Sequence, residues 1–375
     1  MTKVLKTNID YTFKMLYIIA IIMVVDGHIG TFDYLSLNNL LRYQNYHLAI
    51  FMFASGYFLN LEKDYKEFIL NKTKKLIIPL YIWNFIYGFL CVILNNYFGF
   101  QIGENFNLYN LLYAPLVDGH QFIYNMASWF IVPLFFLQII SFIVLKPLHN
   151  KISLKTLSII CFITTLTISS IVIPSTIQQN NQRDIHLFFS RIIYFFPSFS
   201  FGFLYRHCLK KYDTLNTPTY LFIILLITSI LCHLYPYYNH IPAWLNDIYE
   251  PMLVLYAICF LAILFWLRIS KILSSLVKSS STLTYISNHT FDIMMHHFIG
   301  FMIIKALLSP FGNNFNSFQF KHNIWYHYFP INETLIAWIY IFITIVIVLL
   351  AVFTINYFYD KIRKILSIWC HTTIK

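Results

Sequence analysis

The chain has 375 residues, of which 58% are hydrophobic and only 11% are charged, with a formal net charge of +11 and a mean hydropathy of +0.64. A soluble domain carries roughly 25% charged residues because these cover the surface of its core, so the composition excludes an ordinary soluble protein. The positive charge does not indicate nucleic-acid binding, since the sequence contains no basic helix and no aromatic RNA-binding motif.

The apolar residues are grouped into ten segments that we interpret as membrane spans. A helix needs about 20 mostly apolar residues to cross a bilayer. We expect spans near residues 13–32, 47–61, 76–98, 127–146, 154–174, 188–206, 218–236, 250–267, 283–307 and 334–358. The second is short, and polar residues interrupt the ninth. The sequence therefore predicts an all-α, polytopic membrane protein in which residues 1–375 form a single transmembrane domain.

The loops between these spans differ in positive charge. Most of the 26 Lys and Arg residues lie at the two ends of the chain or in the loops that follow even-numbered spans, and the exceptions are Arg42, Arg183, Arg191, Lys305 and Lys321. Because loops rich in Lys and Arg stay in the cytoplasm, we expect both ends to be cytoplasmic. The sequence thus predicts a multi-pass protein of the cell membrane, and no cleavable signal peptide is evident.

The first span carries ionisable residues, which are costly inside a membrane and so are functional candidates. Asp26 and His28 lie in its outer half. At about 100° per residue, Tyr17 and Lys14 lie within roughly 40° of the face of His28. Tyr17 is about 16 Å from His28 along the helix axis. Asp26 lies on another face, so it is not simply the carboxylate that orients His28.

The second and third spans carry small and basic residues. Ser55 and Gly56 permit close approach of another helix, and they also permit passage of a slim ligand such as a pantetheine arm. Lys72 and Lys75 are three residues apart and share a helix face, which suits contact with phosphates. Both lysines, with Lys74 between them, also fit a plain topology signal.

The outer loops and the ninth span supply the remaining candidates. Gly119-His120 precedes a run of aromatic and amide residues that includes Trp129; such a run suits a carbohydrate and equally suits an interfacial aromatic belt. His296 and His297 lie near mid-membrane and are candidates for a general base and its partner. Adjacent histidines on a helix point about 100° apart, and the six cysteines are scattered, so we predict no metal site.

Five segments of the chain, in order, resemble motifs of the acyltransferase 3 family of polytopic membrane acyltransferases, and most closely its branch of surface-polysaccharide O-acetyltransferases. The segments are residues 18–28, which end in His28; residues 47–57, similar to HxPLFFFxSGY; residues 72–79, similar to RxxRLLxP; residues 128–135, similar to WFxxxLF; and residues 288–297, which resemble the late histidine helix of the family.

The resemblance implies an acyl-CoA donor, usually acetyl-CoA, used at the cytoplasmic side, and transfer of its acyl group to a sugar hydroxyl. It makes His28 the catalytic histidine and places Lys72 and Lys75 at the phosphates of the donor. The family usually has Arg or Lys 11 positions before its histidine, where this chain has Tyr17. Lys14, one turn lower, is a candidate to take over that contact.

The resulting hypothesis is an O-acyltransferase that acts between a cytosolic donor and a membrane-bound acceptor. His28 acts as a general base on the acceptor hydroxyl or relays the acyl group, and Asp26, His296 and His297 are further catalytic candidates. Lys72, Lys74, Lys75, Lys14, Tyr17 and Ser55 are the candidates for binding the donor. The candidates for binding the acceptor, a surface polysaccharide or glycolipid, are His47, His120 and Arg191.

Two other classes of protein fit parts of the same pattern. An exporter of polysaccharide or lipid-linked sugar also suits aromatic outer loops, and its loss removes surface polymer rather than acetyl groups. A membrane sensor without chemistry suits the span pattern, but the intramembrane His and Asp residues count against it.

Overall fold

The computed structural model describes the backbone of residues 9–29, 40–177, 185–238, 240–246 and 248–372. Within these ranges, the structure describes only the backbone of residues 177, 359, 360 and 362–372. Residues 30–32, at the predicted end of the first span, and Arg183 lie outside the described residues. The described residues are 79% helical, and none of them forms a strand.

The described helices follow the predicted spans. They are α1 (Tyr11–Gly27), α2 (His47–Tyr57), α3 (Tyr65–Lys72), α4 (Ile78–Phe98), α5 (Ala114–Val117), α6 (Ile131–His149), α7 (Leu154–Ile177), α8 (Ile185–Leu204), α9 (Thr217–Leu234), α10 (Met252–Ser279), α11 (Ser281–Asn288), α12 (Thr290–Leu308), α13 (Ser317–His322) and α14 (Glu333–Thr372). The predicted ninth span is divided at His289, which caps the start of α12.

In the described part of the chain, eight helical stretches are long and apolar enough to cross a membrane. The predicted all-α, polytopic membrane fold is therefore confirmed. Helices α1 and α2, at 17 and 11 residues, are the shorter members of the predicted set. With a rise of about 1.5 Å per residue, α2 extends about 16 Å, roughly half of the hydrocarbon thickness. The number of ten spans and the orientation stay predictions.

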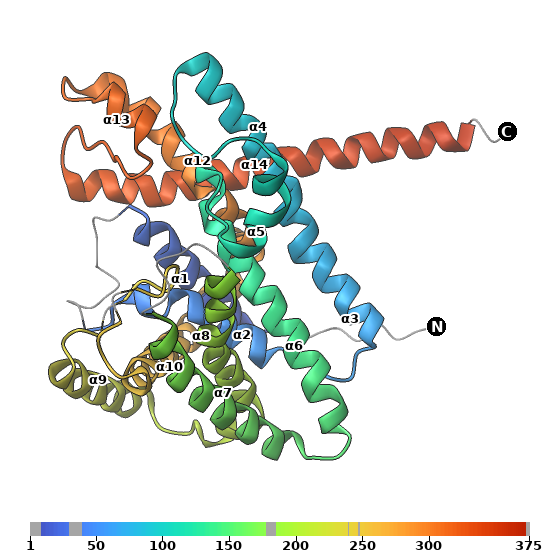
Figure 1. Cartoon of the computed structure of the whole chain (residues 1–375), viewed down its shortest axis with the longest axis vertical. Helices are drawn as coiled ribbons and strands as arrows, with labels where there is room; N and C mark the ends of the chain where they lie inside the picture. The colour runs from blue at the N-terminus through green and yellow to red at the C-terminus, as the bar shows by residue number, and fades with distance from the viewer. Residues whose placement is uncertain (1–8, 30–39, 178–184, 239, 247, 373–375) are drawn as a thin grey trace.

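Helices α1, α2 and α8 lie at the centre of the molecule, with α7, α9 and α10 on one side and α12 and α14 on the other (Figure 1). Helix α2 packs along α8, α1 packs along α10, and α12 packs along α14. The central position of α1 and α2 means that residues on them face the interior of the bundle rather than lipid.

A glycine on each of two helices lets α2 and α8 approach closely. A Cβ atom on Gly56 would lie 1.8 Å from the carbonyl oxygen of Phe199, and one on Gly202 would lie 1.8 Å from that of Phe53. No side chain fits at such distances, so both positions require glycine. The close helix approach predicted at Ser55-Gly56 is confirmed.

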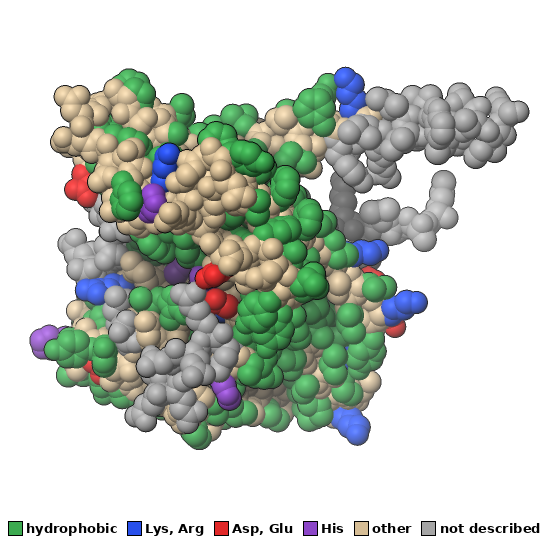
Figure 2. Space-filling model, turned by 45° about the horizontal axis from the view of Figure 1, so that its top comes forward, with side chains coloured by type: hydrophobic (Ala, Val, Ile, Leu, Met, Phe, Trp, Pro, Cys, Tyr) green, Lys and Arg blue, Asp and Glu red, His purple; other side chains and the backbone are tan. Residues whose placement is uncertain are grey.

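The outer surface of the bundle is apolar, as a lipid-facing surface must be. On α9, Phe222 is 65% exposed and Ile230 is 50% exposed. Figure 2 shows hydrophobic side chains over a broad area of one face, whereas Lys and Arg side chains lie mainly near its edges. Lipid, rather than water, therefore completes the burial of these helices.

Candidate active site

A cavity of about 320 Å³ lies against the carboxyl-terminal end of α1 and the start of α2. We call it the histidine cavity, because the three histidines His28, His47 and His120 line it. Its wall also contains Trp129, Trp244 and Trp325. The structure thus brings together two predicted groups, the histidine of the first span and the acceptor-binding histidines, from three separate parts of the chain.

The hydrogen bonds of these histidines define which ring nitrogen can act as a base. Nδ1 of His28 lies 2.6 Å from the carbonyl oxygen of Val24, and Nδ1 of His47 lies 2.7 Å from that of Tyr43. A carbonyl oxygen only accepts, so each Nδ1 carries the hydrogen and donates it. In the neutral ring the lone pair then resides on Nε2. Both rings therefore have a basic Nε2 available for a ligand in the cavity.

His297 packs directly against His28, with ring centroids 4.8 Å apart. It is fully buried, and its Nδ1 lies 2.8 Å from the carbonyl oxygen of Met294. His296, on the next face of α12, instead makes a 2.7 Å hydrogen bond through Nδ1 with the hydroxyl of Tyr87. Only His297 of this pair is thus a direct neighbour of His28, and neither ring lines the histidine cavity.

The segment that follows α13 also packs against His28. The ring of Trp325 stacks on that of His28, with centroids 6.0 Å apart and planes within 12°, and Nε2 of His327 lies 3.0 Å from the His28 carbonyl oxygen. The buried amino group of Lys305 donates to the carbonyl oxygen of Ile324, at 3.2 Å. These contacts hold this segment as one wall of the cavity.

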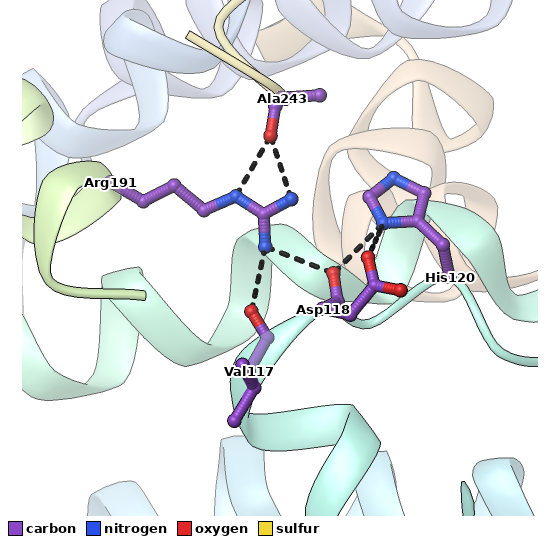
Figure 3. A network of polar contacts seen from close by, with 5 residues as sticks. All are labelled: Val117, Asp118, His120, Arg191 and Ala243. Carbon is purple, nitrogen blue, oxygen red and sulfur yellow. Dashed lines mark hydrogen bonds and ion pairs between the residues drawn. The ribbon is translucent and has the colours of Figure 1, made fainter. Parts of the chain in front are cut away.

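Arg191, on α8, holds two further segments of the cavity wall in place (Figure 3). Its Nε and Nη2 donate to the carbonyl oxygen of Ala243, at 2.9 and 2.6 Å, and its Nη1 donates to those of Val117 and Asp118, at 3.2 and 2.9 Å. The guanidinium is 2% exposed and lies 4.5 Å above the ring of Trp129. Four of its five N–H groups are thus used by backbone carbonyls.

His120 is oriented by Asp118. Its Nδ1 lies 2.9 Å from Oδ1 of that carboxylate and 2.8 Å from the Asp118 carbonyl oxygen (Figure 3). One face of its ring stacks on Trp244, with centroids 4.4 Å apart. Burial lowers the pKa of His120 below its ordinary value, although the hydrogen bond to Asp118 opposes that shift. At neutral pH the ring is therefore uncharged.

A second, smaller cavity of about 140 Å³ lies beside Tyr17 in α1 and the carboxyl-terminal end of α2. We call it the lysine cavity, because Lys72 lines it together with Tyr17 and Ser55. Ser55 Oγ accepts a 3.3 Å hydrogen bond from Nε2 of Gln138, and the Lys72 amino group lies 5.5 Å from the ring centre of Phe68. Three of the predicted donor-binding residues therefore meet at one place.

The two cavities share the same pair of helices. Helix α1 contributes Tyr17 to one and His28 to the other, about 16 Å apart along its axis. Helix α2 contributes Ser55 and His47 in the same way, about 12 Å apart. Phe51 lies between them, since its ring stacks on Tyr17 at 5.8 Å and packs against Phe130 of the histidine cavity at 6.2 Å.

Seven predicted site residues lie outside both cavities: His296, His297 and Arg191, described above, and Lys14, Lys74, Lys75 and Asp26. Lys14 donates a 2.6 Å hydrogen bond to Oδ1 of Asn288 and so connects α1 to α11. Lys74 and Lys75 are exposed. A π-helical turn over residues 73–77 follows Lys72, so the three-residue spacing does not place Lys75 on the face of Lys72 as it would in a regular α-helix. Asp26 is 2% exposed, on a different face of α1 from His28, as predicted.

Sequence reasoning missed Trp244, Trp325 and Asp118 as parts of the site. All three lie in loops, where no helical period indicates a direction. The only signal for the two tryptophans was the aromatic content of the outer loops, and Asp118 lies two residues before the predicted candidate His120. No group of three His, Cys, Asp or Glu side chains with metal-binding geometry occurs among the described residues.

Comparison with known proteins identifies one family. A family model described as an acyltransferase domain, that of the acyltransferase 3 family, matches residues 12–356, a range that includes both cavities. No curated protein and no solved structure matches the chain.

Proposed function

Because the chain belongs to the acyltransferase 3 family, and is thus a membrane acyltransferase, we propose that it moves an acetyl group from acetyl-CoA to a hydroxyl of a surface polysaccharide or of its lipid-linked precursor. One observation carries the proposal. Helices α1 and α2 line two cavities. One contains a cation, and the other contains neutral imidazoles and tryptophans. An enzyme that joins two unlike substrates needs two such sites.

The lysine cavity is proposed as the donor side. The Lys72 amino group is a point charge suited to a phosphate of acetyl-CoA. The exposed Lys74 and Lys75 add positive charge close to Lys72 in the sequence. Ser55 and Gly56 leave room beside Tyr17 for the slim pantetheine arm. A tyrosine at position 17 offers a hydroxyl in place of the usual cation, so we expect the phosphate contacts to rest mainly on Lys72.

The histidine cavity is proposed as the acceptor side. Tryptophan rings suit the apolar faces of sugars, and imidazoles suit their hydroxyls. The two histidines predicted to bind the acceptor, His47 and His120, line this cavity. We propose that Arg191 serves the acceptor indirectly, by holding the wall segments that carry Trp244 and His120.

His28 is proposed as the catalytic histidine. Its ring lines the cavity with the Nδ1–H bonded to the Val24 carbonyl oxygen, which leaves Nε2 as the basic nitrogen, and the ring also packs against His297 and Trp325. Such a group can take a proton from a hydroxyl or take the acyl group itself. His28 ends the helix that leads from the lysine cavity, so it is the group that a thioester extended along α1 would meet.

The predicted orientation places the lysine cavity towards the cytoplasm, where acetyl-CoA is made, and the histidine cavity towards the outer side of the cell membrane. This arrangement would let a cytosolic donor serve an acceptor that never enters the cytosol.

The test compares surface polysaccharide by proton NMR from cells with and without this protein. We expect the O-acetyl signals to disappear without it while the amount of polymer stays the same. Unchanged acetyl signals would refute the proposal. Loss of the polymer itself would instead support an exporter of polysaccharide or lipid-linked sugar.

A further inference from the structure

The histidine cavity contains more basic groups than a single-histidine mechanism uses. His28, His47 and His120 all line it, and each donates its Nδ1–H to an oxygen of the protein. They differ in the oxygen that accepts. His28 and His47 donate to backbone carbonyls, whereas His120 donates to the carboxylate of Asp118 as well as to a carbonyl.

This difference matters when a ring takes up a proton. A protonated imidazole is stabilised by a carboxylate at Nδ1 far more than by a neutral carbonyl, because the hydrogen bond then joins opposite charges. Serine hydrolases likewise place a carboxylate behind the Nδ1 of their general-base histidine, and here the Asp118 side chain is 15% exposed. Among the three rings, His120 is the best suited to accept a proton during a reaction.

The geometry also points the ring in a useful direction. His120 lines the cavity while Asp118 does not, so the carboxylate lies behind the ring. In Figure 3 the second ring nitrogen is on the side away from Asp118. Stacking on Trp244 and the hold of Arg191 on the Asp118 carbonyl fix both members of the pair.

We propose that Asp118 and His120 form the general-base pair that deprotonates the acceptor hydroxyl, and that His28 is thereby left to carry the acyl group. The inference rests on the proposed acyltransferase function and assigns its proton transfer to a residue outside the helix of the catalytic histidine. It makes His120 a catalytic residue and Asp118 and Arg191 positioning residues.

The two steps balance. In the first, Nε2 of His28 forms a bond to the acyl carbon of the thioester, the C–S bond breaks, and the thiolate of CoA leaves, so the ring becomes a cationic acyl-imidazole. In the second, the acceptor hydroxyl gives its proton to Nε2 of His120 while its oxygen forms the new C–O ester bond. The C–N bond to His28 then breaks, and His120 releases the proton to water, where the thiolate takes it.

The experiment uses the full-length protein in native membranes, with acetyl-CoA as donor and two acceptors: de-O-acetylated surface polysaccharide and hydroxylamine. A sugar hydroxyl must lose a proton as it attacks, whereas hydroxylamine attacks through a nitrogen lone pair that needs no base. The variants are His120→Gln, Asp118→Asn and His28→Ala. The matched control is His322→Gln. His322 lies on α13 outside the cavity, and its Nδ1 is hydrogen-bonded to the Phe318 carbonyl oxygen.

We expect His120→Gln to lower transfer to polysaccharide about 100-fold, the usual contribution of a general base, while transfer to hydroxylamine stays within about threefold of the unmodified protein. Asp118→Asn should show the same selectivity with a loss of about tenfold, because the hydrogen bond remains and only its charge is lost. His28→Ala should lose both reactions, and His322→Gln neither.

Two results would overturn the pair's proposed role. Full polysaccharide transfer by His120→Gln would show that its ring takes no proton, and equal loss of both reactions would show that His120 only holds the cavity together. If the unmodified protein transfers no acetyl group to either acceptor, the proposed function itself fails, which distinguishes that failure from failure of the pair alone.

Discussion

The histidine cavity and the lysine cavity lie at different levels along the same two helices, but their walls are chemically unlike. The first presents neutral imidazoles and tryptophan rings, and the second presents an amine, a phenol and a hydroxyl. Phe51 packs between them against Tyr17 on one side and Phe130 on the other. In the proposed reaction the first wall suits a sugar and the second suits the phosphates of acetyl-CoA.

The comparison indicates how short helices serve the proposed reaction. Helix α2 has 11 residues, and still lines both cavities because it lies in the centre of the bundle. The close contact of Gly56 and Gly202 with the facing backbones holds it there. The proposed donor and acceptor sites are thus separated by about 16 Å along α1, a distance that the pantetheine arm must bridge in the proposed reaction.

The separation of a donor cavity from an acceptor cavity is tested first by Lys72→Ala, for which we expect the larger change in KM. Removing the one lysine that lines the lysine cavity should raise the KM for acetyl-CoA about tenfold, equivalent to ~1.4 kcal/mol for one lost charge-assisted contact. The KM for the polysaccharide should stay the same. Initial rates over a range of acetyl-CoA concentrations measure the change.

The exposed Lys74 provides the matched control, since it lies two residues further along the chain on another face. Its replacement by Ala should change the KM for acetyl-CoA less than twofold. An equal effect of both replacements would mean that the lysines act only through their general positive charge, and the lysine cavity would lose its proposed role.

A smaller effect, on the KM for the other substrate, is expected from Trp325→Ala. The ring of Trp325 lines the histidine cavity and is 52% exposed, which leaves a face free for a sugar ring. Loss of that stacking should raise the KM for the polysaccharide about threefold, or ~0.7 kcal/mol, and leave the KM for acetyl-CoA unchanged. Trp338→Ala, near the start of α14 and outside both cavities, should change neither constant. A rise in the KM for acetyl-CoA would contradict the separation of the two sides.

The fold could largely be predicted from the sequence, because apolar segments of about 20 residues have one stable arrangement in lipid. The shortness of α2 was visible in its apolar segment, and so was the break near His289. The face on which Lys75 lies was not predictable, since a three-residue spacing implies a shared face only in a regular α-helix. The π-helical turn after Lys72 removes that condition.

The candidate site, too, was predictable where it lies on regular helices and unpredictable where it lies on loops. Helical geometry predicted that Tyr17 and His28 share a face of α1 about 16 Å apart. In the structure Tyr17 lines the lysine cavity and His28 lines the histidine cavity. The pairing of His120 with Asp118 depends on loop backbone held by Arg191, which lies far away in the sequence. No local pattern contains such a contact, so the loop tryptophans and the carboxylate became visible only in three dimensions.

The most direct test of the central claim uses the purified protein in liposomes, supplied with radiolabelled acetyl-CoA and de-O-acetylated surface polysaccharide. The two-cavity account predicts that label appears on the polysaccharide as an alkali-labile ester, and that His28→Ala lowers the initial rate at least about 100-fold while the variant still inserts and folds. Equal labelling by the variant and the unmodified protein, or no labelling by either, would contradict it.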